Sequence, residues 1–173
     1  MPIVVMGVAG TGKTTVGSLL GAALNLPFTD GDALHSAESI AKMSAGVALT
    51  DEDRRPWLWR VGLELRRRGG VIACSALRRS YRDVIRAVGP DTQFVHLVGD
   101  AATIEARLSA RSGHFMSSRM LSDQLALLEP LEADEVGLEA DITSTPNAIV
   151  ASAVKRLQLE FAPRSDEVTV LRP

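Results

Sequence analysis

The feature that most constrains how this chain can fold is a glycine-rich stretch near its start, "GVAGTGKT" at residues 7–14. It fits the pattern G-x-x-x-x-G-K-[ST] in full, directly after an apolar run and directly before a helical pattern. In that setting the backbone N–H groups of the loop and the positive end of the helix dipole converge on phosphate oxygens. The stretch therefore predicts a strand–loop–helix unit that binds a nucleoside triphosphate.

The residues of this loop have expected roles of their own. Its glycines permit the backbone angles that a phosphate cradle needs. Lys13 is expected to reach the β- and γ-phosphates, and the Thr14 hydroxyl to join a Mg²⁺ shell made mostly of water and phosphate. The predicted nucleotide ligands in this loop are Gly7, Gly10, Thr11, Gly12, Lys13, Thr14 and Thr15.

Strand-like apolar runs alternate with helical patterns along the rest of the chain. Strands are predicted at 2–6, 27–30, 71–75, 94–98 and 138–142, and helices near 13–24, 36–45, 51–68, 79–88, 101–110, 118–128 and 146–160. Three of the strands are nearly continuous in hydrophobic residues, which indicates burial on both faces. The alternation predicts an α/β fold with a mainly parallel sheet between two layers of helices.

Length and composition narrow the organisation and the partners. A chain of 173 residues suits one domain, predicted over 1–162, with a tail at 163–173 that is either disordered or an added edge strand. The net charge of −2 gives no sign of a nucleic-acid partner, and no apolar run approaches the length of a membrane span. The single cysteine, Cys74, cannot form an internal disulfide, so we expect a cytoplasmic protein.

A phosphate-binding loop alone leaves a switch GTPase, an ATPase motor and a small kinase as alternatives. The guanine-reading pattern N-K-x-D is absent, because neither Asn25 nor Asn147 is followed by lysine. A motor usually carries an acidic residue at the end of a long apolar strand, but here "VIACSAL" places Ser75 at that point. The acidic partner of the metal must therefore come from elsewhere in the chain.

A second stretch, "FTDGDALH" at 28–35, offers that acidic partner. Asp30 and Asp32 follow a short strand, at the sheet edge where ligands bind in open α/β folds, and alternation along an extended segment would point both the same way. We assign Asp32 to orient an attacking hydroxyl and accept its proton late in the transfer, and Asp30 to the Mg²⁺ surroundings, although the two roles could be exchanged. The competing interpretation is that one aspartate merely caps the following helix.

These blocks, taken together with three others, resemble the gluconate kinases, P-loop sugar-acid kinases akin to shikimate and adenylate kinases. The blocks are "GVAGTGKTT", "FTDGDALH", "KMSAGVALTDEDRRPWL", "CSALRRSYRD" and "RSGHFM" with the later "LEPLEADE". The resemblance implies ATP-dependent phosphorylation of D-gluconate on its 6-hydroxyl. It also implies a five-stranded parallel sheet in the order 2-3-1-4-5, a mobile lid at about residues 111–119, and a homodimer.

An acid substrate calls for cations near the strand ends. The planar fork of arginine grips a carboxylate with two hydrogen bonds, so Arg54, Arg78 and Arg82 are predicted clamps, the last two on one helix face. Lys42 is a further candidate. An ordinary surface ion pair is the competing interpretation for each arginine.

The remaining predicted ligands lie around the same cleft. His35 follows Asp32 by three residues, and Ser75 ends a strand. Arg107 and Arg111 are four apart on the helix that runs into the lid, and both are predicted nucleotide contacts. Closure of the lid would bring Arg111 to the transferring phosphoryl group and exclude water. The other predicted substrate contacts are His114 and Gln124, and the adenine is expected between the lid and the loop at 143–148.

Two alternatives to a gluconate kinase stay open. The same scaffold serves other small acceptors, such as shikimate, a nucleoside monophosphate or another sugar acid. A nucleotide-binding regulator that hydrolyses ATP slowly is the third class.

Overall fold

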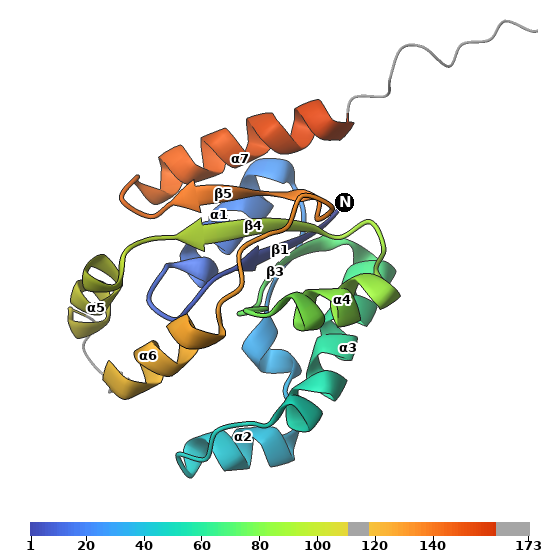
Figure 1. The fold of residues 1–173 in the computed structure, drawn as a ribbon. Coiled ribbons are helices and arrows are strands. Elements are labelled where there is room, and N and C mark those ends of the chain that lie inside the picture. The colour runs from blue at the N-terminus through green and yellow to red at the C-terminus, as the bar shows by residue number, and fades with distance from the viewer. Residues whose placement is uncertain (111–117, 162–173) are drawn as a thin grey trace, which may run out of the picture.

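The computed structural model describes residues 1–110 and 118–161, and its centre is one parallel sheet (Figure 1). The strands are β1 (Pro2–Met6), β2 (Phe28–Asp30), β3 (Gly70–Ala73), β4 (Gln93–Val98) and β5 (Gly137–Asp141). Their order in the sheet is β2-β3-β1-β4-β5, and every neighbouring pair is parallel. The predicted strand order is confirmed.

Helices connect the strands, as parallel pairing requires. They are α1 (Lys13–Leu24), the 3₁₀ turn η1 (Gly31–Leu34), α2 (Ala37–Ser44), α3 (Asp51–Arg68), α4 (Arg79–Val88), α5 (Ala101–Ser109), α6 (Ser118–Leu127) and α7 (Pro146–Phe161). None of them is both long enough and apolar enough to cross a membrane, over the residues that the structure describes.

The two faces of the sheet are covered by different helices (Figure 1). Val16 of α1 and Ala153 of α7 belong to a core that also contains Val5 and Val95 from the strands. On the other face, Leu58 and the rest of the inner side of α3 pack with α4 against the sheet. Alternate residues of each strand thus enter different cores, which explains why the central strands are apolar throughout.

Local signals in the sequence fix several helix ends. Thr50 caps α3, with its hydroxyl accepting from the Asp53 N–H while the Asp53 carboxylate accepts from the Thr50 N–H. This reciprocal cap sets the start of α3 at Asp51. Gly12 begins α1 from a left-handed conformation, with φ of 95°.

The helix and strand bounds agree with prediction to within two residues. The largest difference is at β3, which ends at Ala73, so that Ser75 lies in the loop beyond the strand. The predicted tail at 163–173 lies outside the described residues, and so does the predicted lid apart from Ser118 and Arg119, which begin α6.

Candidate active site

The phosphate loop occupies the turn between β1 and α1, at the carboxyl edge of the sheet. Gly7, Gly10 and Gly12 all have positive φ, which side chains with a Cβ rarely adopt. A Cβ on Gly10 would also lie 2.7 Å from the Leu108 side chain. The loop is further held by the Thr11 hydroxyl, which donates to the Val8 carbonyl at 2.8 Å. These constraints leave a preformed loop at the start of a helix, as phosphate binding requires.

Lys13 lies within this loop. Its Nζ donates to the Val8 carbonyl oxygen at 2.9 Å. The ammonium group is therefore already on the loop side where phosphates would enter.

Thr14 and Asp30 come together across the sheet edge. The Thr14 hydroxyl donates to Asp30 Oδ2 at 3.1 Å. Both side chains offer oxygen, the ligand atom that Mg²⁺ prefers, and the described residues contain no cluster of three or more His, Cys, Asp or Glu that could hold a metal unaided. This pair fits an ion that takes most of its ligands from water and phosphate.

Asp30 and Asp32 are not equivalent. Asp30 ends β2, and its Oδ1 accepts from the Asp32 N–H at 3.1 Å, so it caps η1. Because the chain turns into a 3₁₀ helix at Gly31, the premise of an extended segment through Asp32 is wrong. No hydrogen bond or ion pair to the exposed Asp32 carboxylate is found within residues 1–110 and 118–161. Asp32 is thus the carboxylate available to a ligand.

Close packing holds this acidic turn against the sheet. A Cβ on Gly31 would lie 2.4 Å from the Ala73 carbonyl oxygen, so only glycine fits between the aspartates. The Trp57 indole N–H donates to the Gly31 carbonyl at 2.7 Å, and the His35 ring stacks on Trp57 with centroids 4.2 Å apart. Trp57 is therefore a wall that fixes the turn carrying Asp32.

His35 lies beside this wall. Burial lowers the pKa of His35, and the positive charges of Arg60 and Arg54 act in the same direction against the opposing effect of Asp32. The lowered pKa favours the uncharged ring, whose buried Nδ1 has no hydrogen-bond partner among the described residues.

Cys74 lies just beyond β3, under the same edge. Burial raises the pKa of its thiol to about 12, and the charges of Lys13, Asp32 and Asp30 also act on it. Those charges come from the phosphate loop and from the acidic turn. The hydrogen bond from Thr14 to Asp30 shows directly that the two motifs share one corner of the molecule.

Two of the predicted substrate arginines form a pair. Arg54 Nη1 and Arg78 Nη1 contact the two oxygens of Asp51, at 3.4 and 3.0 Å. Arg78 is the residue before α4 and not part of it, so the prediction that Arg78 and Arg82 share a helix face is wrong. Lys42 forms an ion pair at 2.7 Å with Asp53, the residue whose carboxylate completes the capping box of α3.

Arg82 has a structural role, and its predicted role as a substrate clamp is wrong. Its side chain is fully buried and forms two hydrogen bonds of 2.7 Å to the Glu135 carboxylate. It also donates to the carbonyls of Glu129 and Pro130 in the loop before β5, and to those of Ala76 and Leu77 in the loop after β3. The mistake arose because a helix face read from sequence does not show what packs over it.

Gln124 contacts the phosphate loop. Its Oε1, from α6, accepts from the Ala9 N–H at 2.8 Å. The predicted partner of Gln124 is a sugar hydroxyl, and that contact stays a prediction. The contact links the helix that follows the predicted lid directly to the nucleotide loop.

A cavity of about 210 Å³ adjoins the phosphate loop. It is lined on one side by the loop and the start of α1, including Thr15, and on the other by Arg107, Ser144, Pro146 and Ile149. Arg107 also donates to the Ile142 carbonyl, which joins α5 to the end of β5. This is the position predicted for the adenine.

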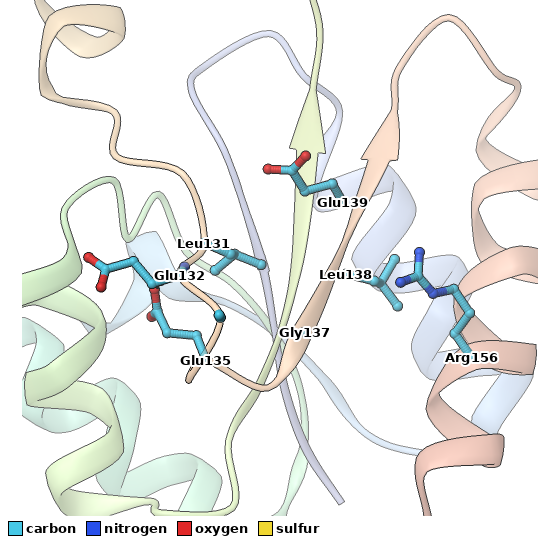
Figure 2. A pocket seen from close by; sticks show the side chains of 8 residues that line it. Leu131, Glu132, Glu135, Gly137, Leu138, Glu139 and Arg156 are labelled. Atoms are coloured by element: carbon cyan, nitrogen blue, oxygen red, sulfur yellow. The ribbon is translucent and has the colours of Figure 1, made fainter.

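A larger cavity, of about 620 Å³, lies elsewhere, at the start of β5 (Figure 2). Three glutamates, Glu132, Glu135 and Glu139, contribute to its lining, with Arg156 on α7 across the strand. So many carboxylates disfavour a triphosphate or a sugar acid. We therefore place the active site at the phosphate loop.

The other predicted residues have these positions. Ser75 is half-buried, and its carbonyl accepts from the Gly7 N–H at 3.3 Å. Arg111 and His114 lie outside the described residues. The sequence reasoning missed the contacts of Asp51 and Tyr81 with the arginine pair, although Tyr81 is the chain's single tyrosine and lies inside the block "CSALRRSYRD".

Known proteins resemble this arrangement over most of the chain. Residues 9–144 match the family model for shikimate kinase. The thermosensitive gluconokinase of Escherichia coli (strain K12) is 46% identical over 137 residues, which cover 76% of this chain and 73% of that protein. The thermoresistant gluconokinase of the same organism is 40% identical over 158 residues, 88% of this chain and 90% of that protein.

A solved structure agrees with these relatives. A gluconokinase from Sinorhizobium meliloti 1021 superposes with a TM-score of 0.81 at 40% identity, covering 93% of this chain and 97% of that chain. The P-loop kinase fold is confirmed, and so is the resemblance drawn from the sequence blocks. The chain belongs to the gluconokinase family.

Proposed function

We propose that this chain is an ATP-dependent kinase that transfers the γ-phosphoryl group of ATP to the 6-hydroxyl of D-gluconate. One observation carries the proposal. The phosphate loop and an acidic turn with an available carboxylate, that of Asp32, meet at one corner of the sheet in a chain of the gluconokinase family. A kinase needs both parts, since one holds the donor and the other orients the acceptor.

The transfer exchanges one P–O bond for another. The 6-hydroxyl oxygen bonds to the γ-phosphorus while the bond from that phosphorus to the bridging oxygen of ADP breaks. The hydroxyl proton passes to the Asp32 carboxylate late in the step, because the transition state is loose. Asp32 orients the hydroxyl before that point.

Cations balance the charge that the donor brings. Lys13 exchanges its bond to the Val8 carbonyl for phosphate oxygens. Mg²⁺ held near Thr14 and Asp30 would neutralise charge on the phosphates. Arg111 supplies a further positive charge to the transferring group, and the adenine occupies the cavity lined by Arg107 and Ser144.

The substrate lies on the other side of Asp32. Arg54 and Arg78 hold its carboxylate, since their guanidinium groups already converge on one carboxylate, that of Asp51. His35 and Ser75 contact its hydroxyls, and Lys42 and His114 complete the site.

We further propose that the protein is cytoplasmic and forms a homodimer. Light scattering would test the homodimer, because it should show a mass of two chains.

An assay of ADP release tests the proposed reaction. The purified chain is given ATP and Mg²⁺ with D-gluconate, shikimate, a nucleoside monophosphate, related aldonic acids, or no acceptor. We expect D-gluconate to stimulate ADP release most strongly. Stronger stimulation by another acceptor would move the chain to a different substrate, and no stimulation by any acceptor would favour a regulatory role.

A further inference from the structure

The arginine pair proposed to hold the substrate carboxylate is itself held by two other residues, Asp51 and Tyr81. Asp51 Oδ1 accepts from the Tyr81 hydroxyl at 2.5 Å and from Arg54 Nη1 at 3.4 Å. Asp51 Oδ2 accepts from Arg78 Nη1 at 3.0 Å. One carboxylate thus joins arginines from two elements, α3 and the loop after β3.

The ring of Tyr81 also contacts the guanidinium groups of the same two arginines. The guanidinium carbons of Arg54 and Arg78 lie 5.7 and 5.9 Å from its centroid, within the range of cation–π attraction. Arg54 Nη1 also donates to the Tyr81 hydroxyl at 3.4 Å. Tyr81 itself is only 6% exposed, so the ring is a fixed surface in the core.

This arrangement holds two positively charged side chains close together in fixed conformations. Two arginine side chains without a partner would repel each other and sample many rotamers. Within the described residues, every hydrogen bond of the two guanidinium groups uses Nη1, which leaves Nε and Nη2 of each without a hydrogen-bond partner. Asp51 and Tyr81 therefore fix the positions of both guanidinium groups and leave their remaining N–H donors for a ligand.

Arg54 lies on the acceptor side of the site. It precedes Trp57 by three residues on α3, and the Trp57 indole N–H donates to the carbonyl of Gly31, the residue next to Asp32, at 2.7 Å. Because Asp51 joins Arg78 to Arg54, the pair belongs to the same side of the site as the acidic turn.

We infer that Asp51 and Tyr81 are positioning residues that make the site prefer an acid to an uncharged polyol of the same length. The inference rests on the proposed function. Neither residue touches the reacting atoms. Each acts through the arginines, so its loss should weaken binding of the carboxylate and leave the transfer step in place.

The test compares D-gluconate with D-glucitol, which has the same six-carbon chain and no carboxylate. We expect Asp51→Asn to lower kcat/KM for gluconate by about tenfold or more, while kcat and the KM for ATP stay within about twofold. The kcat/KM for glucitol, or its inhibition constant against gluconate if it is not phosphorylated, should not change. Tyr81→Phe keeps the ring and should give a smaller loss in the same direction.

Asp83→Asn is a matched control. Asp83 is exposed to a similar extent, 49% against 53% for Asp51, and also bridges two arginines, Arg79 and Arg86. Both partners also bind Asp134, in the loop before β5, and neither is a predicted substrate contact, so neither substrate should be affected. Folding is protected in the Asp51 variant because the cap of α3 uses Thr50 and Asp53.

Three outcomes separate the possibilities. Equal losses for gluconate and glucitol in Asp51→Asn would show a merely structural role and overturn the inference. A gain for gluconate would also overturn it, because Asp51 would then be competing with the substrate carboxylate. If the wild-type chain does not phosphorylate gluconate at all, the proposed function fails instead.

Discussion

Asp30 and Asp32 are two residues apart, yet their surroundings give them different chemistry. Asp30 uses one oxygen to cap η1 and the other to accept from Thr14. Asp32 is exposed, and the part of the chain that the structure describes provides no partner for its carboxylate. The sequence placed the pair at the correct sheet edge, and only the turn geometry distinguishes the cap from the candidate base.

The first prediction concerns Lys13 and Asp32. Lys13→Ala and Asp32→Asn should each abolish turnover in the ADP-release assay, meaning a loss of about 10³-fold or more. Asp32→Asn should retain nucleotide binding in a calorimetric titration, since Asp32 faces the acceptor. If Asp32→Asn kept most of the wild-type rate, its orienting role would be wrong.

At the scale of elements, α4 is fastened to the loop between α6 and β5. Arg82 forms the buried part of this junction with Glu135, and Arg79 forms the exposed part with two hydrogen bonds of 2.7 Å to Asp134. Burial by itself would raise the pKa of Glu135. The hydrogen bonds from Arg82 and from the Glu132 N–H, with the charges of Arg82 and Arg79, lower it instead. Glu135 therefore remains ionised in the core.

The second prediction follows from this buried ion pair. Arg82→Met should reduce the free energy of unfolding by about 3–5 kcal/mol, because it leaves the Glu135 charge buried without a partner. Arg68→Met is the control, since Arg68 is 71% exposed and its pair with Glu64 should contribute less than about 1 kcal/mol. Urea denaturation measures both. Similar losses in the two variants would contradict the account, whereas recovery in Arg82→Met/Glu135→Leu would support it.

Sequence patterns predicted the elements better than the contacts between them. The period of the apolar residues and the cap at Thr50 were enough to find α3, because these signals are local, while the sheet order came from the family resemblance. The burial of Arg82 and the contact from Gln124 to Ala9 depend on segments about 50 and 115 residues away in the chain. No periodicity carries that information.

The charges of the whole molecule determine its response to acid. Burial lowers the pKa of His35 and of His96, against the opposing effects of nearby carboxylates. Several carboxyl groups also have lowered pKa values, including Asp53, whose first cause is the hydrogen bond from Lys42, and Asp134, whose first cause is the hydrogen bond from Arg79. In both cases the unfolded chain binds protons more readily than the folded chain.

The third prediction is therefore a loss of stability in two stages as the pH falls. The folded histidines resist protonation, so stability should begin to fall below the ordinary histidine pKa of 6.5. A steeper fall should follow below 4.5 and 3.8, the ordinary pKa values of Glu and Asp, as the lowered carboxyl groups take up protons. Thermal unfolding from pH 8 to pH 3 measures both stages.

A variant assigns the first stage. His96→Phe removes one of the described rings whose pKa is lowered, and should flatten the slope between about pH 6.5 and 5. The steeper stage should remain. An unchanged slope in the upper range would contradict the contribution of His96.

The thiol below the active-site corner has a practical consequence. With a pKa near 12, almost none of Cys74 is thiolate at neutral pH, so maleimides and mild oxidants should leave it untouched. It is the chain's single cysteine. A second cysteine introduced at an exposed position, such as Ser122 on α6, would thus accept a fluorophore selectively in the otherwise unaltered sequence, and the dye could follow nucleotide binding in real time.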